Sequence, residues 1–216
     1  MSLLSQRVDV RSAFGAGIAV GSEPEAMTHI YESDVNAAIW EREPPQLSPD
    51  ALRRMGNVTL EACLTPDAVA PWVERMLPNA PRALREDVIQ LADMYACLFE
   101  VSHLGLRLKT LDRPMCPRFH VDRVVCRLLT TYAGAGTEYL SNEEVDRRDL
   151  GKPVADPSAL PVLTSGATVR QLPAGAVLLC KGESWPGNEG YGFVHRSPDP
   201  GGQPRLMLSI DGLERG

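Results

Sequence analysis

The spacing of the apolar residues changes once along this chain, and that change most constrains its fold. From Leu84 through Phe99 the apolar residues recur at helical spacing. From Leu104 onward they alternate with polar residues, and short β-prone runs are separated by glycine and proline turns. Helices followed by many short strands are typical of an α+β protein rather than of a parallel α/β sheet. We therefore expect N-terminal helices packed on a β-barrel.

The length and the turn residues of the chain predict one domain preceded by a leader. With 216 residues, 44% of them hydrophobic, the chain can bury a single core. Residues 1–27 are rich in Gly, Ser and Ala without sustained periodicity, which predicts a flexible leader. We expect 28–216 to form one domain, with a mainly helical part at 28–103 and a β-barrel core at 104–216. The polar, proline-containing stretch 141–161 is expected to be a lid-like loop.

Two helix starts carry the same sequence signal. SPD at 48–50 and TPD at 65–67 each supply an N-cap residue, a proline at the first helical position and an acid in the first turn. They predict a short helix to about Met55 and an amphipathic helix that ends at Pro78. For 28–40 we expect a short strand or turn that leads into a helix.

The net charge and the cysteines of the chain indicate which classes of partner and which cellular location to expect. A net charge of −6 gives no electrostatic reason to bind nucleic acid or an anionic membrane, so we expect neither as a partner. No apolar run approaches the roughly 18 residues of a membrane span, and the N-terminus lacks a signal-peptide pattern. Five cysteines without a CxxC pair argue against a disulfide framework. These features predict a cytoplasmic protein.

A histidine and a carboxylate, His120 and Asp122, stand two residues apart at the start of a β-prone run. Because successive side chains of a strand alternate faces, both should point the same way and reach one divalent ion. His195, in GFVHRSP, offers a third ligand. Two histidines and one carboxylate form the facial triad that suits non-haem Fe(II), with the opposite face open for a co-substrate and O2. We therefore predict these three residues as metal ligands and catalytic centre.

A cation follows the third ligand along the chain. Arg205 lies ten residues after His195, at the start of the predicted strand RLMLSI. A guanidinium there is suited to anchor the far carboxylate of a 2-oxo acid whose other end chelates the ion. The sequence thus predicts an anion anchor as well as a metal site.

Two resemblances follow from these residues. The order HxD, a distant histidine and then an arginine resembles the Fe(II)/2-oxoglutarate-dependent dioxygenases, whose fold is a double-stranded β-helix of the jelly-roll type. The phrases FHVDRVVCRLLTTYAGAGTEYL and GFVHRSP also resemble a bacterial family of unknown function, DUF1826, from about Thr28 onward. The resemblance implies that the expected barrel is a cupin-like double-stranded β-helix.

Carried over to this chain, the resemblance assigns Fe(II) to the three predicted ligands and the distal carboxylate of 2-oxoglutarate to Arg205. It also makes Tyr132 a hydrogen-bond partner of that carboxylate. Many members of the superfamily carry Ser or Thr two residues after the arginine, and this chain has Met207 there. Arg127 and Arg196 are therefore alternative anchors for the co-substrate.

The implied activity is hydroxylation of an unknown substrate, with 2-oxoglutarate and O2 as co-substrates. Two alternatives remain open. The first is a non-catalytic, cupin-like protein that binds Zn(II) or another divalent ion at the same site, with Cys116 or Cys126 as an additional soft ligand. The second is an interaction module whose barrel is inert and whose helical face binds a partner.

Overall fold

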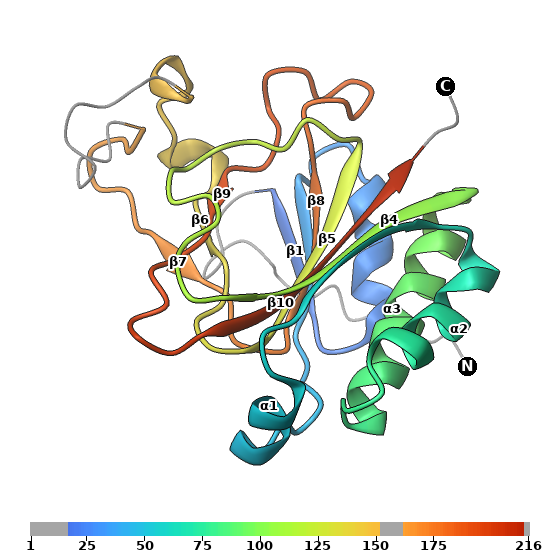
Figure 1. The fold of residues 1–216 in the computed structure, drawn as a ribbon. Helices are drawn as coiled ribbons and strands as arrows, with labels where there is room; N and C mark the ends of the chain where they lie inside the picture. Colours follow the sequence, from blue (N-terminus) through green and yellow to red (C-terminus); the bar gives the residue numbers. More distant parts are fainter. Residues whose placement is uncertain (1–16, 152–161, 214–216) are drawn as a thin grey trace, which may run out of the picture.

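The computed structural model describes residues 17–151 and 162–213, which form two β-sheets and several helices. Figure 1 shows three layers: a small sheet on the left, a large sheet in the middle and helices on the right. The mixed α+β class predicted from the change in apolar spacing is therefore confirmed. None of the described helices has the length and apolar character needed to cross a lipid bilayer.

The large sheet contains seven strands within the described residues, in the order β1-β2-β8-β5-β10-β4-β3. β1 and β2 are parallel, and the other neighbours are antiparallel. The strands are β1 (Ile18–Gly21), β2 (Ala37–Trp40), β3 (Thr59–Leu64), β4 (His103–Leu111), β5 (Cys126–Ala133), β8 (Val177–Lys181) and β10 (Arg205–Leu213).

The small sheet has the order β7-β6-β9 and consists of β6 (Glu138–Tyr139), β7 (Arg170–Gln171) and β9 (His195–Arg196). An isolated bridge from His120 to His195 adds a further segment beside β9. From β4 to β10 the chain passes back and forth between the sheets, with β4, β5, β8 and β10 in the large one. The strand order of each sheet is open, so the described strands do not close into the predicted barrel. The strands of the small sheet are only two residues long and pair with no strand of the large sheet.

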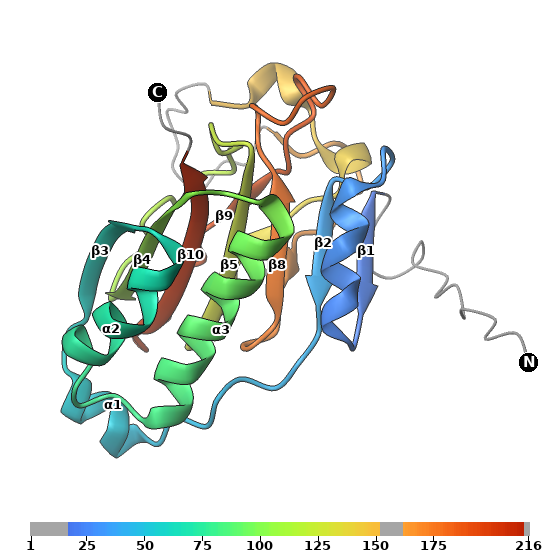
Figure 2. The ribbon, with the colours of Figure 1, turned by 90° about the vertical axis from the view of Figure 1, so that its right-hand side faces the viewer.

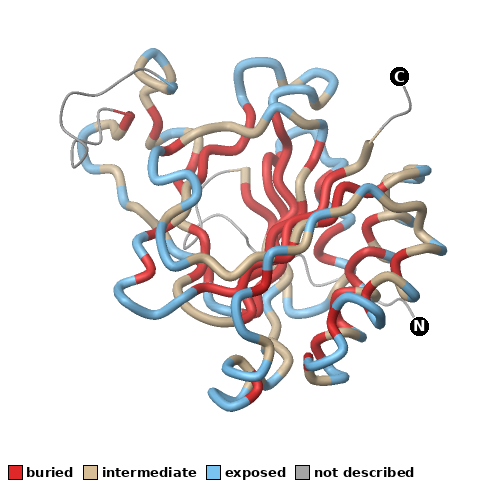
Figure 3. The backbone as a smooth tube through the Cα atoms, viewed as in Figure 1, coloured by how far each residue is buried: buried red, intermediate tan, exposed pale blue. Residues whose placement is uncertain are grey.

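Alternation along the central strands divides their side chains between two cores. Leu208 and Ile210 of β10, like Leu128 of β5, belong to the core beneath the helices. Met207 and Leu129 belong to a second core between the two sheets. This is the period of two expected of a strand buried on both faces. Figure 3 shows the buried backbone concentrated along these central strands.

Three of the described helices cover the outer face of the large sheet. In Figure 2, α2, α3 and the 3₁₀ helix η1 lie in front of the strands. The predicted stripe of α3 is buried and includes Leu84, Leu91 and Tyr95. The predicted helix starts at 49 and 66 are confirmed, and the Ser48 side chain accepts a hydrogen bond from the Ala51 amide. The helices are η1 (Pro24–Tyr31), α1 (Pro49–Met55), α2 (Pro66–Met76), α3 (Arg82–Phe99), η2 (Asn142–Glu144) and η3 (Arg147–Asp149).

The N-terminal part differs from the prediction. Of the expected leader 1–27, residues 1–16 lie outside the described residues, but Ile18 is already buried in the large sheet and pairs with Ala37. Ala19 and Ala26 are buried as well, so the described part of 1–27 packs on the protein and is not a flexible leader. Within 28–40 the predicted order is wrong, because η1 comes first and β2 follows. The strand AAIW is buried on both faces, so it lacks the alternation that marks a half-exposed strand.

The expected lid-like loop is partly visible. Residues 152–161 lie outside the described residues, and the rest contains η2 and η3. Glu144 of η2 forms an ion pair with Arg170 of β7, and its carboxylate accepts hydrogen bonds from the Ser141 amide and hydroxyl. The described part of this loop is therefore attached to the small sheet.

Candidate metal centre

His120 and Asp122 lie in the loop between β4 and β5, and His195 is the first residue of β9. The backbones of His120 and His195 exchange two hydrogen bonds, of 3.0 and 3.1 Å. β5 begins only at Cys126, so the prediction that the HxD motif lies within a continuous strand is wrong. The reason is that the Asp122 carbonyl accepts from the Glu183 amide of the loop after β8 instead of joining a ladder.

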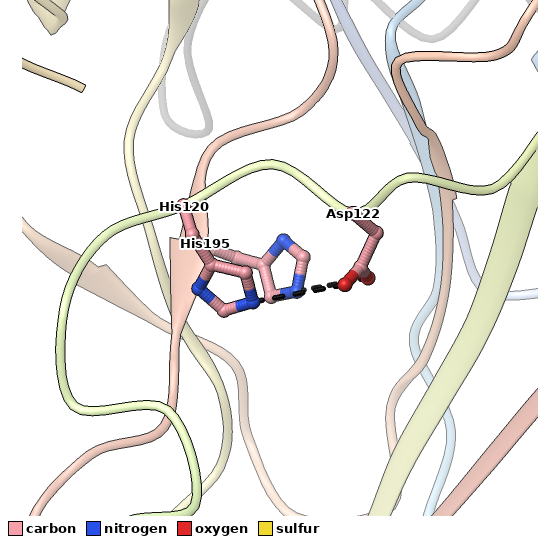
Figure 4. Close-up of side chains that lie close together, drawn as sticks. All are labelled: His120, Asp122 and His195. Atoms are coloured by element: carbon pink, nitrogen blue, oxygen red, sulfur yellow. Dashed lines mark ion pairs between the residues drawn. The ribbon is translucent and has the colours of Figure 1, made fainter. Parts of the chain in front are cut away.

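The three side chains nevertheless converge. Their possible ligand atoms all lie within 4.8 Å of one another. Asp122 Oδ1 is 3.7 Å from His120 Nε2, and Asp122 Oδ2 is 3.3 Å from His195 Nε2. Figure 4 shows both imidazole rings directed at the carboxylate, one from the loop and one from β9. The structure therefore brings together the three residues that the sequence predicts as metal ligands.

The backbone sets which ring nitrogens face this space. His120 Nδ1 lies 3.0 Å from the Arg118 carbonyl oxygen, and His195 Nδ1 lies 3.3 Å from the Phe193 carbonyl oxygen. A carbonyl only accepts hydrogen bonds, so each Nδ1 carries the proton in the neutral ring. The lone pair of each Nε2 is then free for a metal, which is the usual way that outer groups orient histidine ligands.

Asp122 carries the clearest sign of a missing partner. Its Oδ2 atom is buried and has no hydrogen-bond partner among the described residues. A buried carboxylate oxygen without a partner is costly, and a divalent ion would satisfy it. The side chains of Asp122 and His195 are 10% and 6% exposed, whereas that of His120 is 30% exposed. The residues present thus fit a metal ion in a site that opens beside His120.

Mutual interactions shift the protonation of this cluster. Burial opposes the charged form of Asp122, but the His120 and His195 rings, whose Nε2 atoms donate hydrogen bonds to it once they are protonated, and the charge of Arg127 hold its pKa well below the ordinary value. Burial opposes the charged form of His120, but the protonated ring can donate from Nε2 to Asp122 as well as from Nδ1 to the Arg118 carbonyl, so its pKa is raised. Asp122 is therefore ionised at neutral pH, as a metal ligand must be.

Arg127 contacts the metal cluster directly. Its Nη1 lies 2.8 Å from Asp122 Oδ1, and its Nη2 lies 3.0 Å from Asp211 Oδ2. Both ends of the guanidinium are thus occupied by carboxylates of the chain. This does not fit the alternative in which Arg127 anchors a co-substrate. Arg196 is occupied as well, because it pairs with Glu138 at 2.5 Å.

Arg205 is a buried cation, only 1% exposed. Its Nε donates to the Ala135 carbonyl at 2.5 Å, and its Nη2 donates to Thr131 Oγ1 at 3.3 Å. Its Nη1 is buried and has no partner within the described chain. Burial lowers its pKa to about 10, against the opposing charge of Glu138, so it remains charged at neutral pH. Thr131 is a contact that the sequence did not single out.

Tyr132 lies away from this group. It belongs to the core beneath the helices, where its hydroxyl donates to Asp87 Oδ2 of α3 at 2.7 Å. Arg42 forms an ion pair with the same carboxylate. The structure does not bring Tyr132 to the site, and alternation along β5 explains why: Arg127 and Leu129 face the other way.

The cysteines also stay out of the cluster. Among the described residues, the group that could hold a metal contains no cysteine. Cys126 is buried beneath the helices, and Cys116 is exposed. The alternative in which one of them is a soft ligand therefore has no support in the geometry.

Two sheets with helices on the larger one and a His/Asp/His cluster at the edge of the smaller one define an α+β protein with a candidate two-histidine, one-carboxylate metal centre. The chain belongs to the DUF1826 family, described as a protein of unknown function, whose family model matches residues 21–211. A comparison with curated proteins gave no match.

Several solved structures are similar to this chain at low identity. A dioxygenase for auxin oxidation from rice is 14% identical, with 91% of this chain and 82% of that chain covered and a TM-score of 0.48. A dioxygenase for auxin oxidation from Arabidopsis thaliana, in complex with 2-oxoglutarate, is 13% identical, with coverages of 81% and 67% and a TM-score of 0.46. A prolyl-4-hydroxylase from Pseudomonas putida is 12% identical, with coverages of 88% and 98% and a TM-score of 0.40.

Proposed function

We propose that this protein is an Fe(II)/2-oxoglutarate-dependent dioxygenase that hydroxylates a substrate still to be identified. The observation that carries the proposal is Arg205, a buried cation with an unpartnered Nη1. It stands on the face of β10 shared with Met207, which packs between the two sheets. The His/Asp/His cluster is assembled beside β9 of the small sheet. A metal site and a separate cation suit 2-oxoglutarate, because its 2-oxo acid end can chelate the ion and its distal carboxylate can pair with the arginine.

The proposal includes a fold of the double-stranded β-helix type, jelly-roll and cupin-like, with N-terminal helices packed on it. Its support is the path of the chain, which alternates between the sheets: β4, the His120 segment, β5, then β6 with β7, and finally β8, β9 and β10. In such a fold the space between the sheets is the natural place for a ligand. A cytoplasmic location also belongs to the proposal, because the chain carries five free cysteines.

Each residue then has a defined task. His120 and His195 would hold the ion through Nε2, and Asp122 through Oδ2. When bound, Fe(II) together with 2-oxoglutarate supplies the activation of O2 that oxidises a C–H bond. Arg205 binds and orients the distal carboxylate, since a guanidinium holds a carboxylate directionally. The protein therefore contributes orientation and a largely buried site, while the cofactor carries the oxidation.

Thr131 offers a second donor for the same carboxylate. It lies opposite Met207 in the pairing of β5 with β10 and is itself buried. Its hydroxyl oxygen accepts from Arg205, so its own proton is free to be donated elsewhere. A threonine on the neighbouring strand thus compensates for the methionine two residues after the arginine.

The Zn(II) alternative differs in one respect. Three protein ligands and an open position also suit Zn(II). A metal-handling protein, however, has no use for a buried guanidinium that lacks a carboxylate and has an unpartnered Nη1, because desolvating such a cation costs several kcal/mol. Dependence on 2-oxoglutarate therefore separates the two functions.

The test is anaerobic titration of the protein with Fe(II) and 2-oxoglutarate, followed by visible absorption. We expect a weak metal-to-ligand charge-transfer band only when both are present. His195→Ala should lose the band and Fe(II) binding, whereas Arg205→Met should keep Fe(II) binding and lose at least tenfold in 2-oxoglutarate affinity, ~1.4 kcal/mol. Arg54→Met, which removes an exposed arginine on α1, is the matched control. Tight metal binding without any response to 2-oxoglutarate would contradict the proposal.

A further inference from the structure

Arg127 is held between two carboxylates at the edge of the metal cluster. Besides its contacts with Asp122 and Asp211, a second arginine approaches from the other side: Arg107 Nη1 lies 2.6 Å from Asp211 Oδ1. The Asp211 side chain is only 4% exposed. Positive and negative side chains thus alternate along a row of four: Asp122, Arg127, Asp211 and Arg107. Arg127 is held in place by Asp211, and Asp211 is held in turn by Arg107.

The pairing of the strands builds this arrangement. Asp211 of β10 lies opposite Arg127 of β5 on one side and opposite Gly105 of β4 on the other. A Cβ atom at Gly105 would come within 2.9 Å of Asp211 Oδ1. The glycine therefore leaves room for the Asp211 carboxylate that Arg107 contacts. Arg107, Asp211 and Arg127 thus lie on three neighbouring strands, and Arg127 connects them to the carboxylate of Asp122.

The two oxygens of Asp122 consequently differ. Oδ1 is engaged by Arg127 at 2.8 Å, whereas Oδ2 is buried and without a hydrogen-bond partner in the described part of the chain. Oδ2 is also the oxygen nearer to His195, at 3.3 Å from its Nε2. Oδ1 lies 3.7 Å from His120 Nε2, but it is already paired with Arg127, so an ion held by the two histidines would meet Oδ2, the oxygen that lacks a hydrogen bond.

We propose that Arg127 is a positioning residue that makes Asp122 a one-oxygen ligand. By holding Oδ1 it prevents the carboxylate from chelating the ion with both oxygens, so more positions of an octahedral ion stay open for exogenous ligands. This inference rests on the metal-binding part of the proposed function. Only a forked guanidinium can reach both Asp122 and Asp211, because a lysine ammonium is a single point of charge.

The test uses Mn(II), whose bound, exchangeable water is measured by water-proton relaxation per bound ion. In Arg127→Met the freed Oδ1 joins Oδ2 on the ion and displaces one water. The relaxation enhancement per bound Mn(II) should then fall by about one third, from three open octahedral positions to two. If Arg127→Met does not fold, Arg127→Gln replaces it in the test. Its side chain is polar but too short to reach Asp122, so we expect the same decrease.

The matched control is Arg107→Met, which also removes an arginine from Asp211 but leaves Asp122 and Arg127 in contact. It should keep the wild-type relaxation per bound ion even where its unfolding midpoint is lower. The inference is overturned if the Arg127 variants bind Mn(II) with wild-type relaxation, or if Arg107→Met shows the same decrease. Wild-type protein that binds Mn(II) but ignores 2-oxoglutarate would end the dioxygenase proposal and leave this one standing. Wild-type protein that does not bind Mn(II) would end both.

Discussion

Arg205 shows how a single buried side chain can indicate a ligand. A structural arginine in a core normally meets a carboxylate, as Arg42 meets Asp87. Arg205 instead meets a carbonyl and a hydroxyl, and keeps Nη1 without a partner among the residues described. Its pKa of about 10 leaves it charged at neutral pH, so the desolvation cost is not relieved by losing a proton. An anionic ligand would offset that cost.

Thr131 gives a prediction at the same scale. Thr131→Val keeps the shape of the side chain but removes the hydroxyl that contacts Arg205. We expect affinity for 2-oxoglutarate to fall roughly tenfold, because a hydrogen bond to a charged group contributes ~1.5 kcal/mol. Thr131→Ser retains the hydroxyl and should stay close to wild type. Calorimetric titration of the Mn(II)-loaded protein measures both, and equal affinities of the valine and serine variants would show that Thr131 does not contact the ligand.

The sequence identifies some of these residues and not others. His120 and Asp122 are recognisable because the two-residue spacing itself carries the chemistry, even though they lie in a loop rather than on a strand. Thr131 carries no motif, since its role depends on pairing with β10. Tyr132 has the right chemistry to bind a carboxylate. It lies five residues after Arg127 on the same strand, however, so its side chain points to the opposite face, beneath the helices.

Among the elements, η2 is fixed to the small sheet through one glutamate. Glu144 completes a capping box with Ser141 and pairs with Arg170 of β7. Burial opposes its charge, but the hydrogen bonds from Arg170 and Ser141 lower its pKa from 4.5 to about 2. A carboxylate with a depressed pKa stabilises the folded protein above its unfolded pKa, and that contribution is lost as the pH falls towards the folded value.

The prediction concerns Glu144→Gln, which removes the charge and keeps the shape. We expect it to lower the free energy of unfolding at pH 7 by about 1 kcal/mol, the size typical of a lost cap. The difference from wild type should be full above pH 4.5 and shrink as the pH falls from there to about 2. Urea unfolding at several pH values measures it. Glu143→Gln, at the adjacent residue, is the control, and a difference that does not change with pH would contradict the assigned pKa.

An edge strand, β3, and a strand buried on both faces, β2, could not be predicted from the local sequence pattern. β3 was not predicted, because TLEACL alternates between exposed and half-buried positions and has few large apolar residues. Its pairing is supported instead by Glu61, which contacts Arg107 and Lys109 of β4. β2 was missed for the opposite reason, since both of its faces are buried. In both cases the partner strand supplies what the local pattern lacks.

At the scale of the whole molecule, the site depends on contacts between distant segments. His120 and His195 come together only because their backbones form a bridge beside the small sheet. Asp211 contacts both Arg127 and Arg107 only because β5, β10 and β4 are neighbours in the large sheet. The mixed α+β class and the three candidate ligands could be predicted from local patterns. The open strand order and the chain of ion pairs could not, because they arise from register between strands.

The most direct test of the account is a crystal structure of the protein grown with Mn(II) and 2-oxoglutarate, with the ion located by its anomalous scattering. The account predicts one peak bonded to Nε2 of His120, Nε2 of His195 and Oδ2 of Asp122, with the distal carboxylate of 2-oxoglutarate on Arg205. A crystal without that peak, or with the ion held by other residues and Arg205 still without a ligand, would contradict it.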